Sequence, residues 1–485
     1  MKPLHWKTLI YVNIFWLGLN VRNTALGNVF MPYLVDVFVE PQIKNTALGM
    51  LRTAGLIIAM VTQPLAGLLS DRSTSRFGRR RPFIVTGVIF DLVFLVLLGL
   101  SSNYWMLFCA VLLIQISSNV SHGPLQGLIP DLVPEEQHGR AAGIKAIFEL
   151  LPLIVVPFTI ANAVAAGQLT LAIVMTGIIL VIAMILTIFL VHEKPLEAQV
   201  QTPLKEPMLR VAGVLSGILA GSLAGLVVSV SLGGALGLIL WLFLKSAAAW
   251  MAAIFFGGAI AMVSATLAGV WAGVAFSLGK EAKGERPYLW WIVNRLLFLT
   301  AATSIQGFAP FFLMSAFSID RQAAIDLTAK LMMVAGIFTL VSALPTGWLS
   351  DYFGHKKLVA FAGLIGAAGA IVLLGTAIFP RQSVLYIAGS IIGLATGLFL
   401  TSNWALGTNL VPRENAGRFL GISNLAGAGA GMIGAGIGGP VADILNNYQP
   451  GLGYIALFSY YALLFLLSSI SLIGVKKGTI FQGAR

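Results

Sequence analysis

The chain is poor in charge and almost free of cysteine. Only 10% of its 485 residues are charged, whereas soluble domains carry about 25%. Its one cysteine, Cys109, lies in an apolar segment, so an intramolecular disulfide is excluded and a cysteine-based metal cluster is not expected. The HExxH, Gly-x-Ser-x-Gly and P-loop strings are also missing. We therefore expect no enzyme, no cofactor and no metal site.

Apolar residues make up 58% of the chain. Stretches of the roughly 20 residues that a spanning helix needs recur along its whole length. They predict an all-α polytopic membrane protein with two six-helix halves. The expected spans are 9–34, 47–69, 83–100, 105–129, 141–165 and 169–191, then 290–317, 327–349, 358–379, 384–410, 418–445 and 454–475.

A glycine-rich apolar insertion, 209–278, separates the halves. We expect an even number of crossings, because the basic loops on both sides of it should face the cytoplasm. Two crossings fit best and give 14 spans, while four shorter crossings stay possible. Four glycines recur every four residues and predict close helix packing, namely Gly213, Gly217, Gly221 and Gly225. The predicted organisation is 1–192, a linker 193–208, the insertion 209–278, a linker 279–288, and 289–485.

Basic residues predict the orientation in the membrane. Only four fall on the expected outer side: Lys44, Lys245, Arg321 and Arg381. Since Lys and Arg concentrate on cytoplasmic loops, both termini should be cytoplasmic. The net charge of +12 follows from the same rule and does not indicate nucleic acid. We expect a monomer in the cell membrane.

The two halves repeat one another. The loop after the fourth span reads DLVPEEQHGRAAG (131–143), and its counterpart reads NLVPRENAGRFLG (409–421). GLLSD (67–71) likewise recurs as GWLSD (347–351). Asn28 and Gln306 each stand four residues before a proline in the first span of their half. Matches at corresponding positions indicate internal duplication.

A charged string, QPLAGLLSDRSTSRFGRRRPFI (63–84), ends the second span. An aspartate at a helix end followed by arginines suits a latch between helix ends, with Asp71 pairing with Arg79 or with a base from a neighbouring helix. The alternative is that the arginines only hold the topology. The string resembles the helix 2 to helix 3 loop of the major facilitator superfamily. Its form resembles the sucrose–proton symporter branch near the glycoside-pentoside-hexuronide cation symporters.

A second match lies in the fourth span, at Asn119, Gly123, Pro124, Leu128, Asp131 and Leu132. The resemblance implies proton-coupled solute transport, with cytoplasmic gating at Asp71, Arg72, Gly78, Arg79, Arg80, Asp131, Arg140, Asp351, Gly354 and Arg418. The chain departs from that branch at His122, where the branch has glutamine, and at Gln126, where plant members have an arginine. Those departures favour proton coupling over sucrose as the implied property.

Charged residues inside spans are functional candidates. Arg22 and Glu149 lie near the membrane midplane by helix rise. The superfamily architecture would let them meet in the central cavity, where a proton could compete with the arginine. The alternative is a permanent salt bridge. Asp91 is predicted to have a structural hydrogen-bonded role, with proton coupling as the alternative. His122 is predicted to bind substrate, relay protons or only pack.

A sugar-like solute needs amide groups and an aromatic platform. The predicted substrate-binding residues are Asn20, Asn23, Asn28, Asn119, Gln306, Asn403 and Trp404. The leading hypothesis is a proton-coupled symporter of a sugar or glycoside that works by alternating access. Two alternatives stay open: an exporter of amphiphilic compounds, and a non-transporting sensor derived from a transporter.

Overall fold

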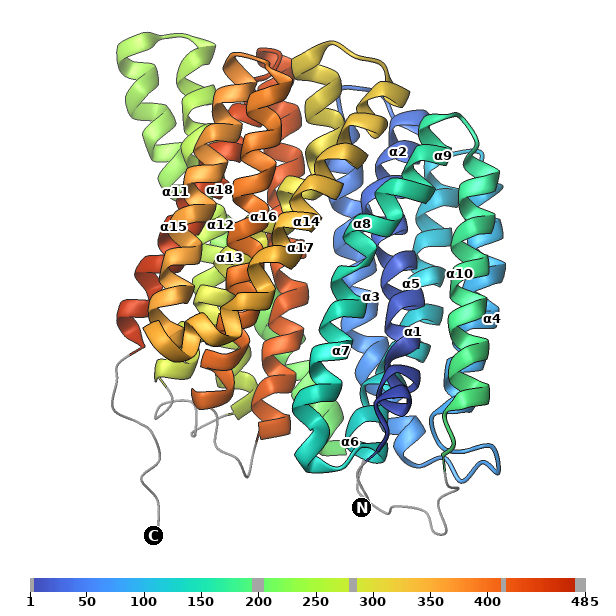
Figure 1. Ribbon diagram of the computed structural model, residues 1–485. Coiled ribbons are helices and arrows are strands. Elements are labelled where there is room, and N and C mark those ends of the chain that lie inside the picture. Colours follow the sequence, from blue (N-terminus) through green and yellow to red (C-terminus); the bar gives the residue numbers. More distant parts are fainter. Residues whose placement is uncertain (1–3, 194–204, 279–285, 411–415, 476–485) are drawn as a thin grey trace. The chain divides into compact units, whose positions relative to one another are not determined.

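The computed structural model describes residues 4–193, 205–278, 286–410 and 416–475 (Figure 1). Every regular element in these ranges is a helix, which confirms the predicted all-α membrane fold. Twelve helices are long and apolar enough to cross a membrane. The helical stretch 6–38 and α17 (Ala416–Tyr448) are not among the twelve, although each lies where the sequence predicts a span.

Contacts group the described chain into two compact units. The first takes in 1–39, 54–208 and 320–336, and the second takes in 40–53, 209–319 and 337–485. The repeat predicts a division at the insertion instead. Two segments depart from that division: the start of α3 (Lys44–Asp71) belongs to the second unit, and the start of α14 (Arg321–Phe353) belongs to the first.

The first unit is built from helices that lie along one another (Figure 1). Besides most of α3, its helices are α1 (Trp6–Ala25), α2 (Met31–Phe38), α4 (Arg81–Gly99), α5 (Tyr104–Gln126), α6 (Leu128–Leu132), α7 (His138–Leu150), α8 (Pro152–Val156), α9 (Asn162–Ala165) and α10 (Leu169–Leu190). A π-helical turn at 26–30 joins α1 to α2. Gly87 lets α4 approach α5 closely, because a Cβ there would overlap Ser121.

The second unit holds the remaining helices. They are α11 (Lys205–Leu244), α12 (Ala247–Leu278), α13 (Arg286–Phe317), α15 (His355–Ile378), α16 (Gln382–Leu410), α17 and α18 (Leu452–Ser471), with most of α14. Phe298 of α13 stacks on Phe399 of α16 with ring centroids 3.7 Å apart, and its ring also meets Phe465 of α18 edge-on. These aromatic contacts join α13, α16 and α18 in one core.

The insertion forms two long helices, α11 and α12, that run side by side (Figure 1). Both are among the candidate spans, which agrees with two crossings rather than four. A Cβ at Gly217 or Gly221 would overlap the backbone of Gly273 or Gly269 of α12. The predicted packing role of these glycines is therefore confirmed, because only glycine lets the two backbones approach this closely.

The two segments that depart from the repeat are held by polar contacts. In the second unit, Asp443 of α17 accepts hydrogen bonds from the backbone N–H of Asn45 (3.2 Å) and of Thr46 (2.6 Å) at the start of α3. In the first unit, Arg321 of α14 binds Asp36 of α2, with its Nε 2.5 Å from Oδ2. A carboxylate suits the free N–H groups of a helix start, so Asp443 serves α3 as a cap from another helix.

Candidate functional site

The first unit holds a polar cluster around Trp16, which we call the Trp16 cluster: Trp16, His122, Lys145 and Glu149. The His122 ring meets the Trp16 ring edge-on with centroids 5.3 Å apart. The Lys145 ammonium lies 4.1 Å from the Trp16 centroid, a cation–π contact. Its Nζ is also 3.3 Å from Oε1 of Glu149, one helical turn further along α7. The cluster therefore combines an aromatic ring, a cation, a carboxylate and an imidazole.

Arg22 does not pair with Glu149, so the predicted Arg22–Glu149 pair is wrong. The Arg22 Nε lies 3.0 Å from Oδ2 of Asp91 in α4, and both side chains are almost wholly buried. Ser117 of α5 donates to the other Asp91 oxygen at 2.7 Å. Arg22 lies six residues after Trp16, which contacts Lys145 of α7. At 3.6 residues per turn, its side chain therefore points about 120° away from that of Trp16. The hydrogen-bonded structural role predicted for Asp91 agrees with these contacts.

Four asparagines of the first unit are predicted to bind substrate, and they differ in how deeply they are buried. The Asn20 and Asn119 side-chain NH₂ groups donate to the carbonyls of Trp16 (2.8 Å) and Gln115 (2.7 Å), each one turn earlier on its own helix. Asn20 is half-buried, whereas Asn119 is buried. Asn23 and Asn28 are half-buried on the first helical stretch. Their substrate-binding roles stay predictions, as does that of half-buried Gln306 on α13.

A second polar cluster lies in the other unit, and we call it the Arg295 cluster: Asn294, Arg295, Asn403, Trp404 and Ser468. The Arg295 Nη1 donates to Oδ1 of Asn403 at 3.0 Å. Its guanidinium lies 5.7 Å from the centroid of the Trp404 ring, which is 40% exposed. The predicted platform residue Trp404 is therefore joined to a cation that lies inside a span.

Asn403 is fully buried and its side chain is used entirely within this cluster. Its NH₂ group donates to Oδ1 of Asn294 (2.8 Å), while its carbonyl oxygen accepts from Arg295. The Asn294 NH₂ group in turn donates to the backbone O and the Oγ of Ser468 (2.8 Å each). These bonds determine which way the Asn403 amide points. Asn403 thus positions Arg295, rather than offering a free amide for a solute as predicted.

The repeat relates the two clusters. With Asp131 equivalent to Asn409 and Pro32 to Pro310, Trp16 corresponds to Asn294 and Gln126 corresponds to Trp404. Gln126 lies beside the Trp16 cluster, with its Nε2 3.5 Å from Nε2 of His122. In each repeat, the first and fourth spans therefore carry a polar cluster at corresponding positions. The side chains that form the two clusters are different.

The cytoplasmic string forms a network in the first unit. Arg80 binds Asp71 (Nη2 to Oδ1, 2.5 Å), Asp131 (Nε to Oδ2, 2.9 Å) and Ser70 (Nη1 to Oγ, 2.6 Å). Arg79 pairs with Asp131, with its Nε 3.1 Å from Oδ2. The latch at Asp71 is thus closed by Arg80, whereas Arg79, the base named from the sequence, binds Asp131.

Two glycines and a glutamate shape this network. Gly127 leaves room for the Arg80 guanidinium, which a Cβ there would overlap. Gly78 has φ +98°, a conformation that favours glycine. Glu193 Oε2 accepts the backbone N–H groups of Arg80 (3.0 Å) and Arg81 (3.3 Å) at the start of α4. Burial raises the pKa of Glu193, although these hydrogen bonds act in the opposite direction.

The other predicted gating residues are Arg72, Arg140, Gly354, Asp351 and Arg418. Arg72 is half-buried and Arg140 is exposed. In the second unit, Gly354 has φ +88° just before α15. The side chains of Asp351 and Arg418 lie outside the described residues. The gating roles of all these residues stay predictions.

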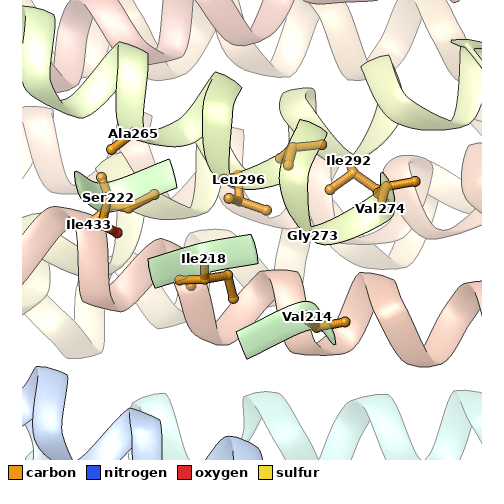
Figure 2. A pocket seen from close by; sticks show the side chains of 12 residues that line it. Val214, Ile218, Ser222, Ala265, Gly273, Val274, Ile292, Leu296 and Ile433 are labelled. Carbon is orange, nitrogen blue, oxygen red and sulfur yellow. The ribbon is translucent and has the colours of Figure 1, made fainter. Parts of the chain in front are cut away.

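The second unit also has an apolar hollow between the inserted helices α11 and α12 and the helices α13 and α17 (Figure 2). Ser222 is the only hydroxyl-bearing residue that lines it; the rest of the lining is aliphatic or glycine, for example Ile218, Val270 and Leu296. A polar solute needs convergent hydrogen-bonding groups. This hollow is therefore unsuited to a sugar.

A family model described as Major Facilitator Superfamily matches residues 17–435. The chain belongs to the Major Facilitator Superfamily. This finding confirms the predicted resemblance, and it makes the protein a multi-pass membrane transporter of that superfamily. The matched range includes the whole insertion, while Trp16 and Ser468 of the two polar clusters lie outside it.

Curated relatives of this superfamily member match it over shorter stretches. Sucrose transport protein SUC3 of Arabidopsis thaliana is 24% identical over 189 residues, which cover 31% of this chain and 32% of that protein. Solute carrier family 45 member 3 of Mus musculus is 31% identical over 147 residues, covering 28% and 26%. The chain thus matches about a third or less of the length of these relatives. The sucrose transport proteins among them agree with the predicted branch.

Solved structures match over almost the whole chain. A D-xylose-proton symporter has a TM-score of 0.64 and 15% identity, covering 96% of this chain and 97% of that one. The POT family transporter PepTSo has a TM-score of 0.65 and 12% identity, covering 97% of this chain and 98% of that one. At such identities the likeness shows the superfamily fold alone.

The sequence analysis gives no site role to Trp16, Lys145 or Ser468 of the two clusters. Lys145 lies four residues before Glu149, a spacing that is typical of an ion pair on one helix face. Trp16 has no signal of its own among the apolar residues of α1. Ser468 has none either, because its role depends on which helix faces Asn294.

Proposed function

We propose that this transporter is a proton-coupled symporter of a sugar or glycoside that works by alternating access. The observation that carries the proposal is the Trp16 cluster, in which an aromatic face, a cation and a carboxylate meet inside the spans. Aromatic rings pack against the apolar faces of sugars, while charged and amide groups bind hydroxyls. The sucrose transport proteins among the relatives and the D-xylose-proton symporter fold support this solute class.

Glu149 is the proposed proton carrier. The side chain of Glu149 is 38% exposed and that of its partner Lys145 is 30% exposed, so the protein leaves part of the ion pair uncovered. After Glu149 takes up a proton, Lys145 keeps its contact with the Trp16 ring. Little is lost when a partly exposed pair separates, since such pairs contribute about 0–1 kcal/mol.

Asp91 suits the same role less well. Protonating Asp91 would leave the Arg22 guanidinium charged and fully buried, without its counter-charge. Removing one partner of a buried pair costs about 3–5 kcal/mol. In this proposal, the Arg22–Asp91 pair is therefore a permanent structural contact that holds α1 against α4.

The cytoplasmic network has a gating role in the proposal. Arg80 is buried and binds two carboxylates from different segments, Asp71 at the end of α3 and Asp131 after α5. Opening the cytoplasmic side would separate these segments and expose the charges to water. The charge distribution along the sequence supports the orientation with both termini in the cytoplasm.

The test is transport by purified protein in liposomes with an imposed pH difference, using radiolabelled sucrose, maltose and glucose. Wild type should concentrate at least one of these sugars when the outside is acidic. Glu149→Gln should abolish that accumulation while counterflow exchange of the same sugar continues, since the amide cannot take up a proton but keeps the size of the side chain. Glu136→Gln, at an exposed carboxylate between α6 and α7, is the matched control. Uphill accumulation by Glu149→Gln would refute the assignment.

A further inference from the structure

Arg295 is a charged side chain held inside a span without an acidic partner among the described residues. Its contacts are the amide oxygen of Asn403 and the face of Trp404, both of which are uncharged. Its Nε is buried and has no hydrogen-bond partner within the described chain. A guanidinium in this position carries a charge that nothing described neutralises, which is costly in a membrane.

The described residues of the second unit contain few carboxylates. Those whose side chains are described are Glu40, which is exposed before α3, and Asp443. Asp443 is already bound to the first turn of α3 through Asn45 and Thr46. The unit therefore offers Arg295 no described acidic residue of its own, in contrast to Arg22, which has Asp91.

The surrounding residues hold Arg295 rather than neutralise it. The chain of hydrogen bonds from Ser468 through Asn294 to Asn403 fixes the amide oxygen that accepts from Nη1. One edge of the guanidinium is thereby anchored while the charge is kept. Such an arrangement pre-organises an arginine for an anion, because its planar fork matches the two oxygens of a carboxylate.

We propose that the transported solute carries a carboxylate that binds Arg295, so that the substrate class is a sugar acid or uronide rather than a neutral sugar. This inference rests on the proposed symport and narrows its solute. The 40% exposed Trp404 ring beside Arg295 supplies an apolar surface for the sugar ring of the same molecule. A carboxylate anion that enters with one proton brings no net charge, so uptake is electroneutral.

The test compares matched pairs of sugars on purified protein: glucose with glucuronate, galactose with galacturonate, and methyl β-glucoside with methyl β-glucuronide. Binding is measured by calorimetry and by thermal shift at pH 7. At least one acid should bind ten-fold or more tightly than its neutral partner. Arg295→Gln should remove that preference, whereas Arg295→Lys, which keeps the charge, should retain part of it. Arg381→Gln, at an exposed arginine before α16, should leave it unchanged.

Uptake into liposomes supplies a second readout. Uptake of the acid should be driven by a pH difference and should not respond to a potassium-diffusion potential. A neutral sugar that binds as well as its acid partner and accumulates with the pH difference would overturn the inference and leave the proposed symport standing. An acid preference that survives in a folded Arg295→Gln protein would also overturn it. Failure of every acid and every neutral sugar to bind would overturn both proposals.

Discussion

Arg22 of the first unit and Arg295 of the second both lie inside spans, but the two arginines have opposite surroundings. Arg22 in the first unit faces Asp91, and a hydroxyl completes the contacts of that carboxylate. Arg295 in the second unit faces an amide and an indole ring. The charge of Arg22 is neutralised by a carboxylate of the protein. In our proposal, Arg295, which neutral groups hold, keeps its charge for a bound anion. The comparison separates a structural contact from a binding site.

The largest expected effect is a loss of stability when one partner of the Arg22–Asp91 pair is removed. Asp91→Asn should destabilise the protein by about 3–5 kcal/mol, because it leaves Arg22 buried with its charge uncompensated. Thermal unfolding in detergent and the yield of monodisperse protein measure this. The double variant Asp91→Asn with Arg22→Met removes both charges and should recover most of the loss. An Asp91→Asn protein as stable as wild type would show that the pair is not structural.

A smaller loss of stability is expected when Asn403, which positions Arg295, is replaced. Asn403→Leu deletes the acceptor for Arg295 and the donor to Asn294, so it should cost about 1–3 kcal/mol. It should also reduce the preference for sugar acids, since Arg295 is no longer oriented. The neighbouring Ser402→Ala is the control, because the Ser402 hydroxyl donates only to its own helix. Unchanged stability together with an unchanged preference would contradict the positioning role.

A substitution in the cytoplasmic network should change the rate of transport rather than the affinity for the solute. Asp71→Asn weakens the contact of Arg80 with the end of α3 but leaves Asp131 in place. Counterflow exchange should slow about ten-fold, while calorimetric affinity for the sugar or sugar acid that binds wild type should stay within about two-fold, since the latch should favour one conformation over another. A loss of affinity as large as the loss of exchange would argue against a latch.

The smallest effect is expected at Glu193. Because burial raises its pKa above the usual range, Glu193 binds a proton more readily in the folded protein than in the unfolded chain. Its contribution to stability is therefore greatest at low pH and declines as pH rises through the folded pKa. Glu193→Gln, a neutral acceptor, should raise the Tm at pH 7 by on the order of 1 °C and flatten the dependence on pH. A lower Tm at pH 7 would show that the carboxylate hydrogen bonds outweigh the cost of burial.

The sequence identified many residues of the site but not the contacts between them. Trp404, Asn403, Asp71 and Arg80 were all named, and each has contacts in one of the networks. The contact partners of these residues could not be predicted from the sequence. Neighbouring residues on a helix point about 100° apart, so a helix rotation decides whether Arg22 meets α4 or α7. Depth in the membrane, on which the Arg22–Glu149 prediction depended, says nothing about that rotation.

The sequence by itself determined the membrane class, the duplication, the all-α fold and the packing of the inserted pair, as at Gly217. Hydropathy predicts the spans, repeats predict the duplication, and glycine spacing predicts close helix packing, each directly from the sequence. Only the tertiary structure decided that Asp91 neutralises Arg22, that Lys145 lies on Trp16, and that Arg295 has amide and indole neighbours. The reason is physical: the stability of a buried charge depends on which side chains from distant segments reach it, and that depends on how the helices pack.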